Sequence, residues 1–382
     1  MSCAVVLGSG IVGLWTANVL AERGHQVKVI SPLDPSHTYS AAAAAVITPL
    51  LPWTHDHPSF NRSWGWYRRT IARLKQLDSS LGPDGGLLEP MPSYECGFEC
   101  DGERVLEKGF GLARFNHLPF AKVDVIELDP PVGVDNHPGE HHQCTFCARF
   151  TADFCNTSVC LSFLQNTARS AGVHFEHRAV EALGDPVLTE CDVVFNCMGF
   201  NSTRLFPDPT LYHVRGQSMF VDLAPGAEEA CFGIASGHHA VFRHRKGLYL
   251  GSYFIEGEPQ VRTFPATVEH DYSIRFAKEA YPTICNRLGL KPAIIDLRCA
   301  TRVNTGIRPY RPDGPRVEVD EALLLSRGLR VIHNYGHGAH GWTIGLATSE
   351  DAVNLGETRG WLRCDGRSWV GARFPETPIW ES

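Results

Sequence analysis

The sequence carries no surplus of positive charge. Lysine and arginine number 35 against 42 aspartate and glutamate residues, so the formal net charge is −7. A surface of this sign offers no general attraction for a phosphate backbone. The composition therefore argues against a nucleic-acid-binding protein, and we expect no nucleic-acid partner.

Long apolar runs are also absent. The chain has no uninterrupted apolar stretch of about 18 residues, the length that a helix needs to cross a bilayer. Its start, an apolar strand followed by a glycine loop, lacks the basic segment and the cleavage site of a signal peptide. Its end, residues 378–382, is not a peroxisomal address. We therefore expect a cytoplasmic protein with no membrane partner.

Internal repeats and low-complexity segments are missing as well. The 382 residues exceed the usual size of one hydrophobic core, so two domains or one elaborated domain are expected. Apolar residues make up 43% and charged residues 20% of the chain, which is typical of a globular protein rather than a disordered one.

Cysteine, in contrast, is abundant. The 13 cysteines form an odd number in a long chain without an export signal, so most should be reduced thiols. The densest group comprises Cys96, Cys100, Cys144 and Cys147, and its paired spacings are only loosely those of a zinc ribbon. Zinc binding is one interpretation, but ordinary buried or surface thiols are favoured, and we expect no metal.

A glycine-rich turn provides the first functional signal. Residues 8–13 read GSGIVG and lie between a short apolar strand, 4–7, and a helix expected over 14–23. In such a turn Gly8 permits the tight bend, Gly10 lets a pyrophosphate approach, and Gly13 lets helix and strand pack closely. The N-terminus of the helix offers N–H groups and a positive dipole end to phosphates. The motif therefore predicts a dinucleotide-binding βαβ unit.

One part of the dinucleotide fingerprint is missing. The second strand, 26–30, is followed by Ser31 instead of the acidic residue that would bind the adenosine ribose. Ser31 could make one hydrogen bond, and Asp34 comes too late in the chain for the usual geometry. The ribose contact is therefore left open.

Periodicity indicates how the remaining chain is organised. Residues 87–150 contain β-rich fragments interrupted by proline and glycine, and residues 216–260 also look sheet-like, so both are expected in a second domain. Apolar spacing predicts helices over about 59–77, 157–170, 266–288 and 343–355, and strands over 174–177, 192–196 and 329–335.

Three further segments resemble a known family. They are residues 43–49 (AAAVITP), 306–312 (GIRPYRP, followed by PRVE at 315–318) and 333–343 (HNYGHGAHGWT). Together with NCMG at 196–199 and RGQ at 215–217, they resemble the D-amino-acid oxidase and D-aspartate oxidase family of FAD-dependent oxidases, in the family's order. The departures from the family pattern are Ala45, where a glycine is usual, and Ala339, His340 and Trp342.

The resemblance implies a fold and a cofactor. The fold would be α/β, with a Rossmann-like FAD-binding domain and a second, mostly antiparallel β-sheet domain that binds the substrate. Residues 1–80, 155–215 and 300–382 would form the first domain, and residues 81–154 and 216–299 the second. The residues expected to contact FAD are Gly8, Ser9, Gly10, Ile11, Val12, Gly13, Ser31, Ser40, Ala44, Ala45, Val46, Thr48, Val180, Cys197, Gly199, Arg308, Gly338, Ala339, His340, Gly341, Trp342 and Thr343.

The resemblance also implies a reaction. An oxidase of this type transfers a hydride from the carbon next to an amine nitrogen to flavin N5, and with O₂ it yields an imine and hydrogen peroxide. The imine then hydrolyses to an oxo acid and ammonia. This chemistry requires a positioned substrate rather than an acid–base residue. The expected catalytic residues are Arg308, whose planar guanidinium matches a carboxylate, and Ala339, whose carbonyl would accept a hydrogen bond from the substrate amine.

The substrate is less determined. The family's carboxylate-binding tyrosine aligns with Ala240, and His238 or His239 could replace it. Leu50 begins an apolar stretch where D-aspartate oxidases receive a second carboxylate, so an acidic substrate is disfavoured. The expected substrate-binding residues are Arg308, His239, Ala240, Leu50 and Ala339, and the expected partners are a small amine or amino acid and O₂.

Other functions remain open. Ala240 and Ala339 are compatible with a specialised biosynthetic oxidase that acts on a larger or secondary amine. A flavin-binding protein without catalytic activity is another alternative. A plain NAD dehydrogenase would leave residues 333–343 without a role. The sequence does not determine the stereochemistry of the substrate, covalent attachment of the flavin, or a homodimeric state.

Overall fold

The computed structural model describes most of the chain. The described residues are 2–48, 59–81, 86–108, 111–114, 123–137, 140–222, 231–237, 239–243, 247–251, 255–256, 268–296 and 300–363. Leu50 and His238 lie outside these ranges. Among the described helices, none combines the length and the apolar character that a membrane crossing requires.

The first of two sheets has six strands. Neighbouring strands are parallel except for the antiparallel pair at one edge. The central strands are short apolar runs that are buried almost throughout, as expected for a parallel sheet covered on both faces. In spatial order the strands are β17 (Arg316–Val319), β18 (Val331–Tyr335), β10 (Val193–Asn196), β1 (Cys3–Leu7), β2 (Gln26–Ser31) and β9 (His174–His177).

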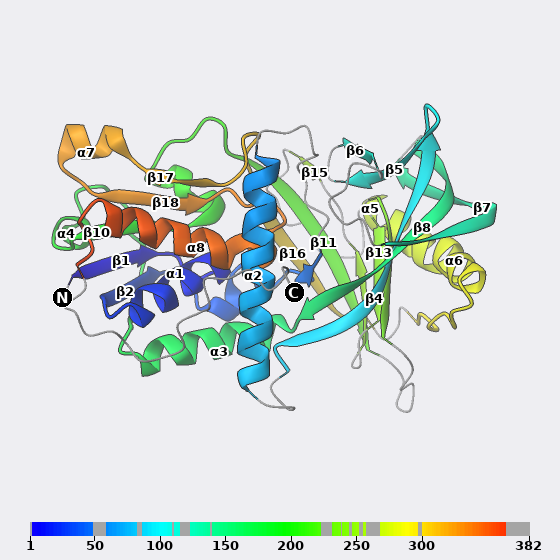
Figure 1. Cartoon of the computed structure of the whole chain (residues 1–382), viewed down its shortest axis with the longest axis horizontal. Coiled ribbons are helices and arrows are strands. Elements are labelled where there is room, and N and C mark those ends of the chain that lie inside the picture. Colours follow the sequence, from blue (N-terminus) through cyan, green and yellow to red (C-terminus); the bar gives the residue numbers. More distant parts are fainter. Residues whose placement is uncertain are drawn as a thin grey trace, which may run out of the picture.

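Helices pack on this sheet and on one another. In Figure 1, α1 (Ile11–Glu22), α3 (Thr157–Ser170) and α8 (Gly341–Thr358) lie beside the first sheet, while α2 (Phe60–Ser80) crosses between the two sheets. The Asn156 side chain caps α3 by accepting a hydrogen bond from the Val159 N–H. The predicted helices over 59–77, 157–170 and 343–355 are thus present, within a few residues of the expected bounds.

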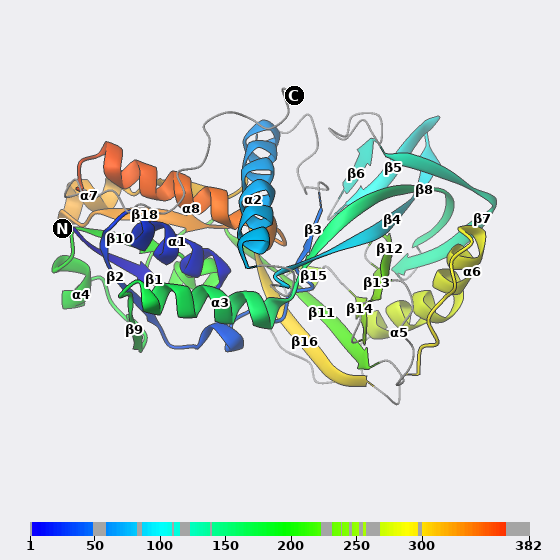
Figure 2. The same ribbon diagram turned by 60° about the horizontal axis from the view of Figure 1, so that its bottom comes forward.

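The second sheet has twelve strands and curls, as Figure 2 shows. Its strand pairs are antiparallel except for the parallel pair β4–β12. Its main path runs β15 (Ile255–Glu256), β11 (Tyr212–Asp222), β14 (Gly247–Gly251), β13 (His239–Arg243), β12 (Phe232–Ser236), β4 (Leu88–Cys100), β5 (Glu103–Lys108) and β6 (Gly111–Arg114). Beside this path, β16 (Ala300–Tyr310) pairs with β11, and β8 (Glu140–Cys155) pairs with β4, β3 (Val46–Ile47) and β7 (Asp124–His137).

The strands of residues 87–150 are longer than the sequence suggests. Pro90 and Pro92 lie inside β4 instead of interrupting it. Within the described chain, β12 pairs with β4 only from Ser93 onward, so the prolines face β8 alone. A proline is tolerated where its missing N–H would have pointed away from the neighbouring strand.

Three consecutive helical segments cover the outer face of the second sheet. They are α5 (Val268–Arg275), the π-helical turn η4 (Phe276–Ala280) and α6 (Tyr281–Arg287). Phe276, Tyr281 and Ile284 pack with strand residues in the core of this half. The sequence predicts one helix over 266–288, and the observed helix contains a π turn in its middle. The remaining short helices are η1 (Pro35–His37), α4 (Pro186–Thr189), η3 (Gly199–Arg204) and α7 (Glu321–Arg327).

The fold prediction is confirmed: a Rossmann-like α/β half is joined to a mostly antiparallel β half. The division of the chain into domains at residues 80, 154, 215 and 299 stays a prediction.

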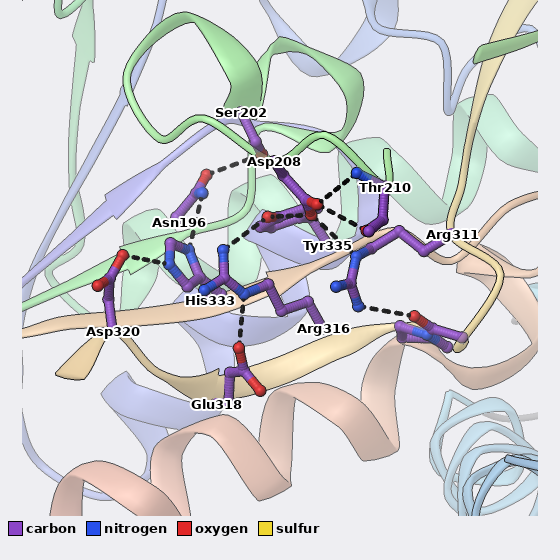
Figure 3. Close-up of polar contacts among 12 residues, drawn as sticks. Asn196, Ser202, Asp208, Thr210, Arg311, Arg316, Glu318, Asp320, His333 and Tyr335 are labelled. Atoms are coloured by element: carbon purple, nitrogen blue, oxygen red, sulfur yellow. Dashed lines mark hydrogen bonds and ion pairs between the residues drawn. The ribbon is translucent and has the colours of Figure 1, made fainter. Parts of the chain in front are cut away.

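A buried carboxylate joins the two halves. Asp208 accepts hydrogen bonds from Arg311 Nε at 2.8 Å and from the Tyr335 hydroxyl at 2.8 Å (Figure 3). Its other oxygen accepts from the N–H and the hydroxyl of Thr210. Arg311 directly follows β16 of the second sheet, and Tyr335 ends β18 of the first. Asp208 therefore holds the ends of two strands from different sheets together.

A second buried polar group, drawn close to these contacts in Figure 3, is His333. Its Nδ1 accepts from Asn196 Nδ2 at 3.1 Å, and its Nε2 donates to Asp320 at 3.0 Å, which defines one neutral tautomer (Figure 3). Burial, and then the charge of Arg316, lowers the pKa of His333 from 6.5 to about 4. Between these values the unfolded chain binds a proton that the folded protein does not, so the free energy of unfolding falls as the pH falls.

The carboxyl group of Asp208 also makes the free energy of unfolding fall with falling pH, in a lower pH range. Burial alone would raise its pKa, but hydrogen bonds from Thr210 and Tyr335 and the charge of Arg311 lower it from 3.8 to about 2. The resulting stabilisation is present above pH 3.8 and is lost as the pH falls toward 2.

We predict that acid destabilises the fold partly through His333. In urea unfolding, the wild type should lose about 2 kcal/mol of unfolding free energy between about pH 7 and about pH 4.5 from this ring. The His333→Asn variant has no titrating ring at this position and should lose clearly less. Burial, and then the charge of His340, lowers the pKa of His337 to about 3, so His337 should account for part of the remaining loss. Equal losses in both proteins would contradict the prediction.

Candidate active site

A cavity of about 710 Å³ lies where the two sheets meet. A volume of this size accommodates a large organic ligand. The first sheet contributes the ends of β1 and β2 and the loops that follow β9, β10 and β18. The second sheet contributes residues of β4, β11, β12, β13, β14 and β16.

The glycine turn forms one end of the cavity. Gly8 has φ +103°, and an added Cβ there would lie 2.7 Å from the Cys197 carbonyl oxygen. At Gly13 an added Cβ would lie 2.0 Å from the Gly8 carbonyl oxygen, so only glycine lets α1 pack this closely on the turn. Ile11 and Val12, in the first turn of α1, border the cavity. The positive end of the α1 dipole therefore faces the space where a pyrophosphate would lie.

Serines close the loop at the end of β2. Ser9 Oγ donates to the Leu33 carbonyl at 2.6 Å and lies 2.9 Å from Ser31 Oγ. Val180 borders the same part of the cavity, next to Arg178, which pairs with Asp185 at 2.6 Å. Ser9, Ser31 and Val180 thus all line the cavity, and their contact with FAD stays a prediction.

Residues 40–48 form a side wall. Ser40 Oγ accepts a hydrogen bond from the Ile11 N–H at 2.9 Å, and Trp342 Nε1 donates to the Ser40 carbonyl at 3.1 Å. This wall is therefore tied to both glycine-containing loops. Ala45 is buried and has φ +53°, a left-handed backbone conformation that favours glycine. Ala44, Val46 and Thr48 also line the cavity.

The loop between β18 and α8 forms a second wall. Gly336 and Gly338 have φ +85° and +57°, and the Gly338 N–H donates to the Pro309 carbonyl at 2.8 Å. An added Cβ on Gly338 would lie 2.7 Å from the Tyr310 ring. The predicted contacts Ala339, His340, Gly341, Trp342 and Thr343 line the cavity next to it, at the N-terminus of α8.

Two more predicted contacts come from the end of β10. Cys197 is buried between Thr16 and the glycine turn, and burial raises the pKa of its thiol to about 12. Gly199 has φ +58° and starts the short helix η3. Both residues line the cavity.

The floor of the cavity is the face formed by the strands of the second sheet. Arg308 provides the positive charge on this floor. It lies on β16 opposite Val214, and its guanidinium extends over the neighbouring Gly216. An added Cβ on Gly216 would lie 2.2 Å from Arg308 Nη1, so a glycine is required beneath the guanidinium. Burial lowers the pKa of Arg308, while Tyr310 and Tyr249 act in the opposite direction. Arginine nevertheless keeps its charge in proteins, so the cavity presents a cationic fork.

The two tyrosines beside Arg308 were not predicted. Burial raises the pKa of Tyr249, and it raises the pKa of Tyr310 to about 12. Both phenols therefore keep their protons and can donate hydrogen bonds to an anion. Tyr310 lies inside the GIRPYRP segment and Tyr249 in the sheet-like stretch 216–260, but the proximity of both residues to Arg308 was not visible in the sequence.

The two predicted substrate contacts on β13, Ala240 and His239, have different surroundings. Alternation along this strand turns Ala240 and Phe242 toward the cavity and Val241 into the core of the second sheet. His239 borders the cavity, but its ring stacks on Phe276 and its Nδ1 lies 3.0 Å from Ser273 Oγ. A role for His239 in binding a carboxylate would require this ring to leave its present position. Leu50 lies outside the described residues.

The cysteine group behaves as two separate features. Cys96 and Cys147 face each other across β4 and β8 with their sulfur atoms 2.6 Å apart, whereas Cys100 lies near the end of β4. Within the described ranges, no three His, Cys, Asp or Glu side chains gather into a possible metal site.

Comparisons with known proteins agree with this geometry. The family model described as DAO, FAD dependent oxidoreductase, matches residues 4–355. A D-amino-acid oxidase of Rubrobacter xylanophilus is 29% identical over 360 residues, covering 92% of this chain and 95% of the relative. A D-aspartate oxidase of Homo sapiens is 26% identical over 362 residues, covering 92% and 93%.

Solved structures show the same fold. A glycine oxidase from Bacillus cereus has a TM-score of 0.61 at 17% identity and covers 95% of this chain and 96% of its own. An iminodiacetate oxidase from Chelativorans sp. has a TM-score of 0.62 at 16% identity, with coverage of 94% and 95%.

We predict that Gly13→Ala loses most of its bound FAD. The added methyl group would meet backbone atoms of Gly8, so α1 must move away from the turn. The measurement is the ratio of flavin to protein absorbance after gel filtration. Gly65→Ala is the matched control, because Gly65 lies in α2 with nothing within 4 Å of its added Cβ. Equal flavin content in the two variants would contradict the prediction.

Proposed function

The chain belongs to the DAO family of FAD-dependent oxidoreductases, and on this premise we propose that it oxidises an amino acid or a related amine at the carbon next to the nitrogen. Bound FAD would accept the hydride and pass the electrons to O₂, which gives an imine and hydrogen peroxide, and the imine would hydrolyse to an oxo acid and ammonia. The observation that carries the proposal is the half-buried Arg308, whose guanidinium lies over Gly216 on the floor of the cavity.

The residues around the cavity fit an extended dinucleotide. The glycine turn and the N-terminus of α1 would hold the pyrophosphate. Ser31 and Val180 would contact the adenosine end, while the wall at 40–48, Cys197 and Gly199 would border the middle. The loop 338–343 would contact the flavin end, where the positive end of the α8 dipole favours a group that gains negative charge.

The substrate side is built from the second sheet. Arg308 would bind the substrate carboxylate through two parallel hydrogen bonds, which fixes the direction of the reacting C–H bond. Tyr249 and Tyr310 keep their phenolic protons and would support the same carboxylate. The carbonyl of Ala339 would accept a hydrogen bond from the substrate amine.

The first test is anaerobic reduction. The purified protein should show a visible flavin spectrum that bleaches when D- or L-amino acids are added without oxygen, and it should regain its colour with O₂ while hydrogen peroxide is formed. A flavin that photoreduces but is reduced by no amine in a broad panel would instead identify a flavin-binding protein without this activity.

A second test concerns the guanidinium. Arg308→Lys should lower kcat/KM for amino acids by about a hundredfold or more, because a buried ionic contact loses its geometry. Gly216→Ala should also lower kcat/KM for amino acids, through a raised KM, because its methyl group displaces the Arg308 guanidinium. The flavin content of this variant should stay unchanged. An amine without a carboxylate is the internal control and should be affected little. Equal losses for both kinds of substrate would contradict the assigned role.

A larger or secondary amine is the second candidate substrate. It is favoured by the short side chains of Ala235 and Ala240 on the cavity floor, where bulky residues would limit substrate size. Turnover of secondary amines without turnover of primary amino acids would select this alternative.

A further inference from the structure

The floor of the cavity carries a carboxylate that the proposed reaction does not use. Glu95 lies on β4, is 5% exposed and lines the cavity. Its neighbours Tyr94 and Cys96 pack in the hydrophobic core on the opposite face of the strand. Alternation therefore turns Glu95 to the same side as Ser93, which also lines the cavity.

The register places Glu95 at one end of a row of small residues. It pairs with Ala235 on β12, which pairs with Ala240 on β13, which pairs with Gly251 on β14. An added Cβ on Gly251 would lie 2.8 Å from the Ser218 Cβ on β11. The residues of this row between Glu95 and β11 thus carry only methyl groups or hydrogen atoms. The ring of Tyr249 lies beside the Gly251 end of the row, where an added Cβ would be 3.3 Å from its Cε1.

The opposite end of the floor carries Arg308. Its guanidinium extends over Gly216, two residues from Ser218 on the same strand. Among the described residues that line the cavity, the second sheet supplies one guanidinium, Arg308, and one carboxylate, Glu95. The other charged lining residues, Arg178, Glu181 and Arg204, belong to the loops of the first sheet near the glycine turn. The substrate half of the cavity is therefore dipolar, with a positive and a negative end.

The separation of these ends sets the length of a ligand that meets both. Neighbouring strands are about 4.8 Å apart, so four steps give a path of about 19 Å between the α-carbons of Glu95 and Ser218 along the floor. The Glu95 side chain shortens this path, while the Arg308 guanidinium lies beside Gly216, two residues along β11 from Ser218. A compact amino acid reaches only one end, whereas an extended one can span the gap.

We propose that Glu95 is a specificity-determining residue that selects amino acids with a cationic group at the far end of a long side chain, of the length of lysine or arginine. This inference rests on the proposed function, because Arg308 holds the carboxylate of the same molecule. A carboxylate facing a low-dielectric cavity attracts an ammonium or a guanidinium and repels a second carboxylate. Acidic amino acids are therefore disfavoured by charge.

The test compares lysine with norleucine, which lacks only the terminal ammonium. The wild-type holoenzyme should prefer lysine. Glu95→Gln, which keeps the shape and removes the charge, should lower kcat/KM for lysine by about thirtyfold and leave norleucine within about threefold. The same variant should improve turnover of glutamate. Glu99→Gln is the matched control, because Glu99 is an exposed carboxylate on the same strand that does not line the cavity, and it should keep the wild-type preference.

Flavin reduction and ligand titration together distinguish failure of this inference from failure of the proposed function. If amino acids reduce the flavin but the wild type prefers norleucine, or if Glu95→Gln lowers lysine and norleucine turnover alike, the role of Glu95 is overturned while the oxidase activity stands. If no amino acid reduces the flavin, the proposed function fails, and titration with 6-aminohexanoate and hexanoate still tests Glu95. The amino compound should perturb the flavin spectrum at a lower concentration in the wild type, and this advantage should disappear in Glu95→Gln. An advantage that persists in the variant would overturn the inference.

Discussion

The geometry of the cavity depends on the contact of one carboxylate, Asp208, with Arg311 and Tyr335. These three residues come from distant parts of the chain, and each ends or follows a segment that supplies part of the cavity. Arg311 follows the strand that carries Arg308, and Tyr335 precedes the glycine loop at the N-terminus of α8. A shift of either strand would change the distance between the substrate floor and the loop above it. The distance between the two walls of the site is therefore set outside the site, by a buried polar contact that joins the two sheets.

Within the cavity, the glycine and alanine residues that leave space are as important as the residues with large side chains. Gly216 leaves room for the Arg308 guanidinium, Gly338 lets its loop lie on the Tyr310 ring, and Ala235 and Ala240 keep the floor open. A sheet in which many cavity-lining positions are glycine, alanine or serine can enclose a ligand instead of forming a packed core. The charged groups on its floor then act on a ligand in surroundings of low dielectric, which strengthen their effect.

The parts that sequence reasoning predicted are local patterns. The glycine turn at 8–13, the helix at 157–170 and the segments around Arg308 and His333 each carry their own signal within a short stretch. The structure places the glycine turn, the segment around Arg308 and the loop 337–343 around one cavity. The parts that were not predicted depend on the pairing of strands. Glu95 reaches the cavity only through its register with Ala235, and Tyr249 reaches Arg308 only because β14 and β16 flank β11. Strand β4 continues through Pro90 because its neighbour begins later, which no local propensity reveals. Ala45 shows the converse: its departure from the family glycine is visible in the sequence, but its left-handed backbone is not.

The high pKa of Cys197 bears on how such a protein survives its own product. Peroxide attacks the thiolate form of cysteine far faster than the thiol. Cys197 lines the cavity in which the proposed reaction would release hydrogen peroxide, yet burial keeps its sulfur protonated at physiological pH. Burial likewise raises the pKa of Cys285 to about 12, and that of Cys96 well above its usual value, behind the cavity floor. On the proposed function, these three thiols would thus stay in their unreactive form beside the place where peroxide is released.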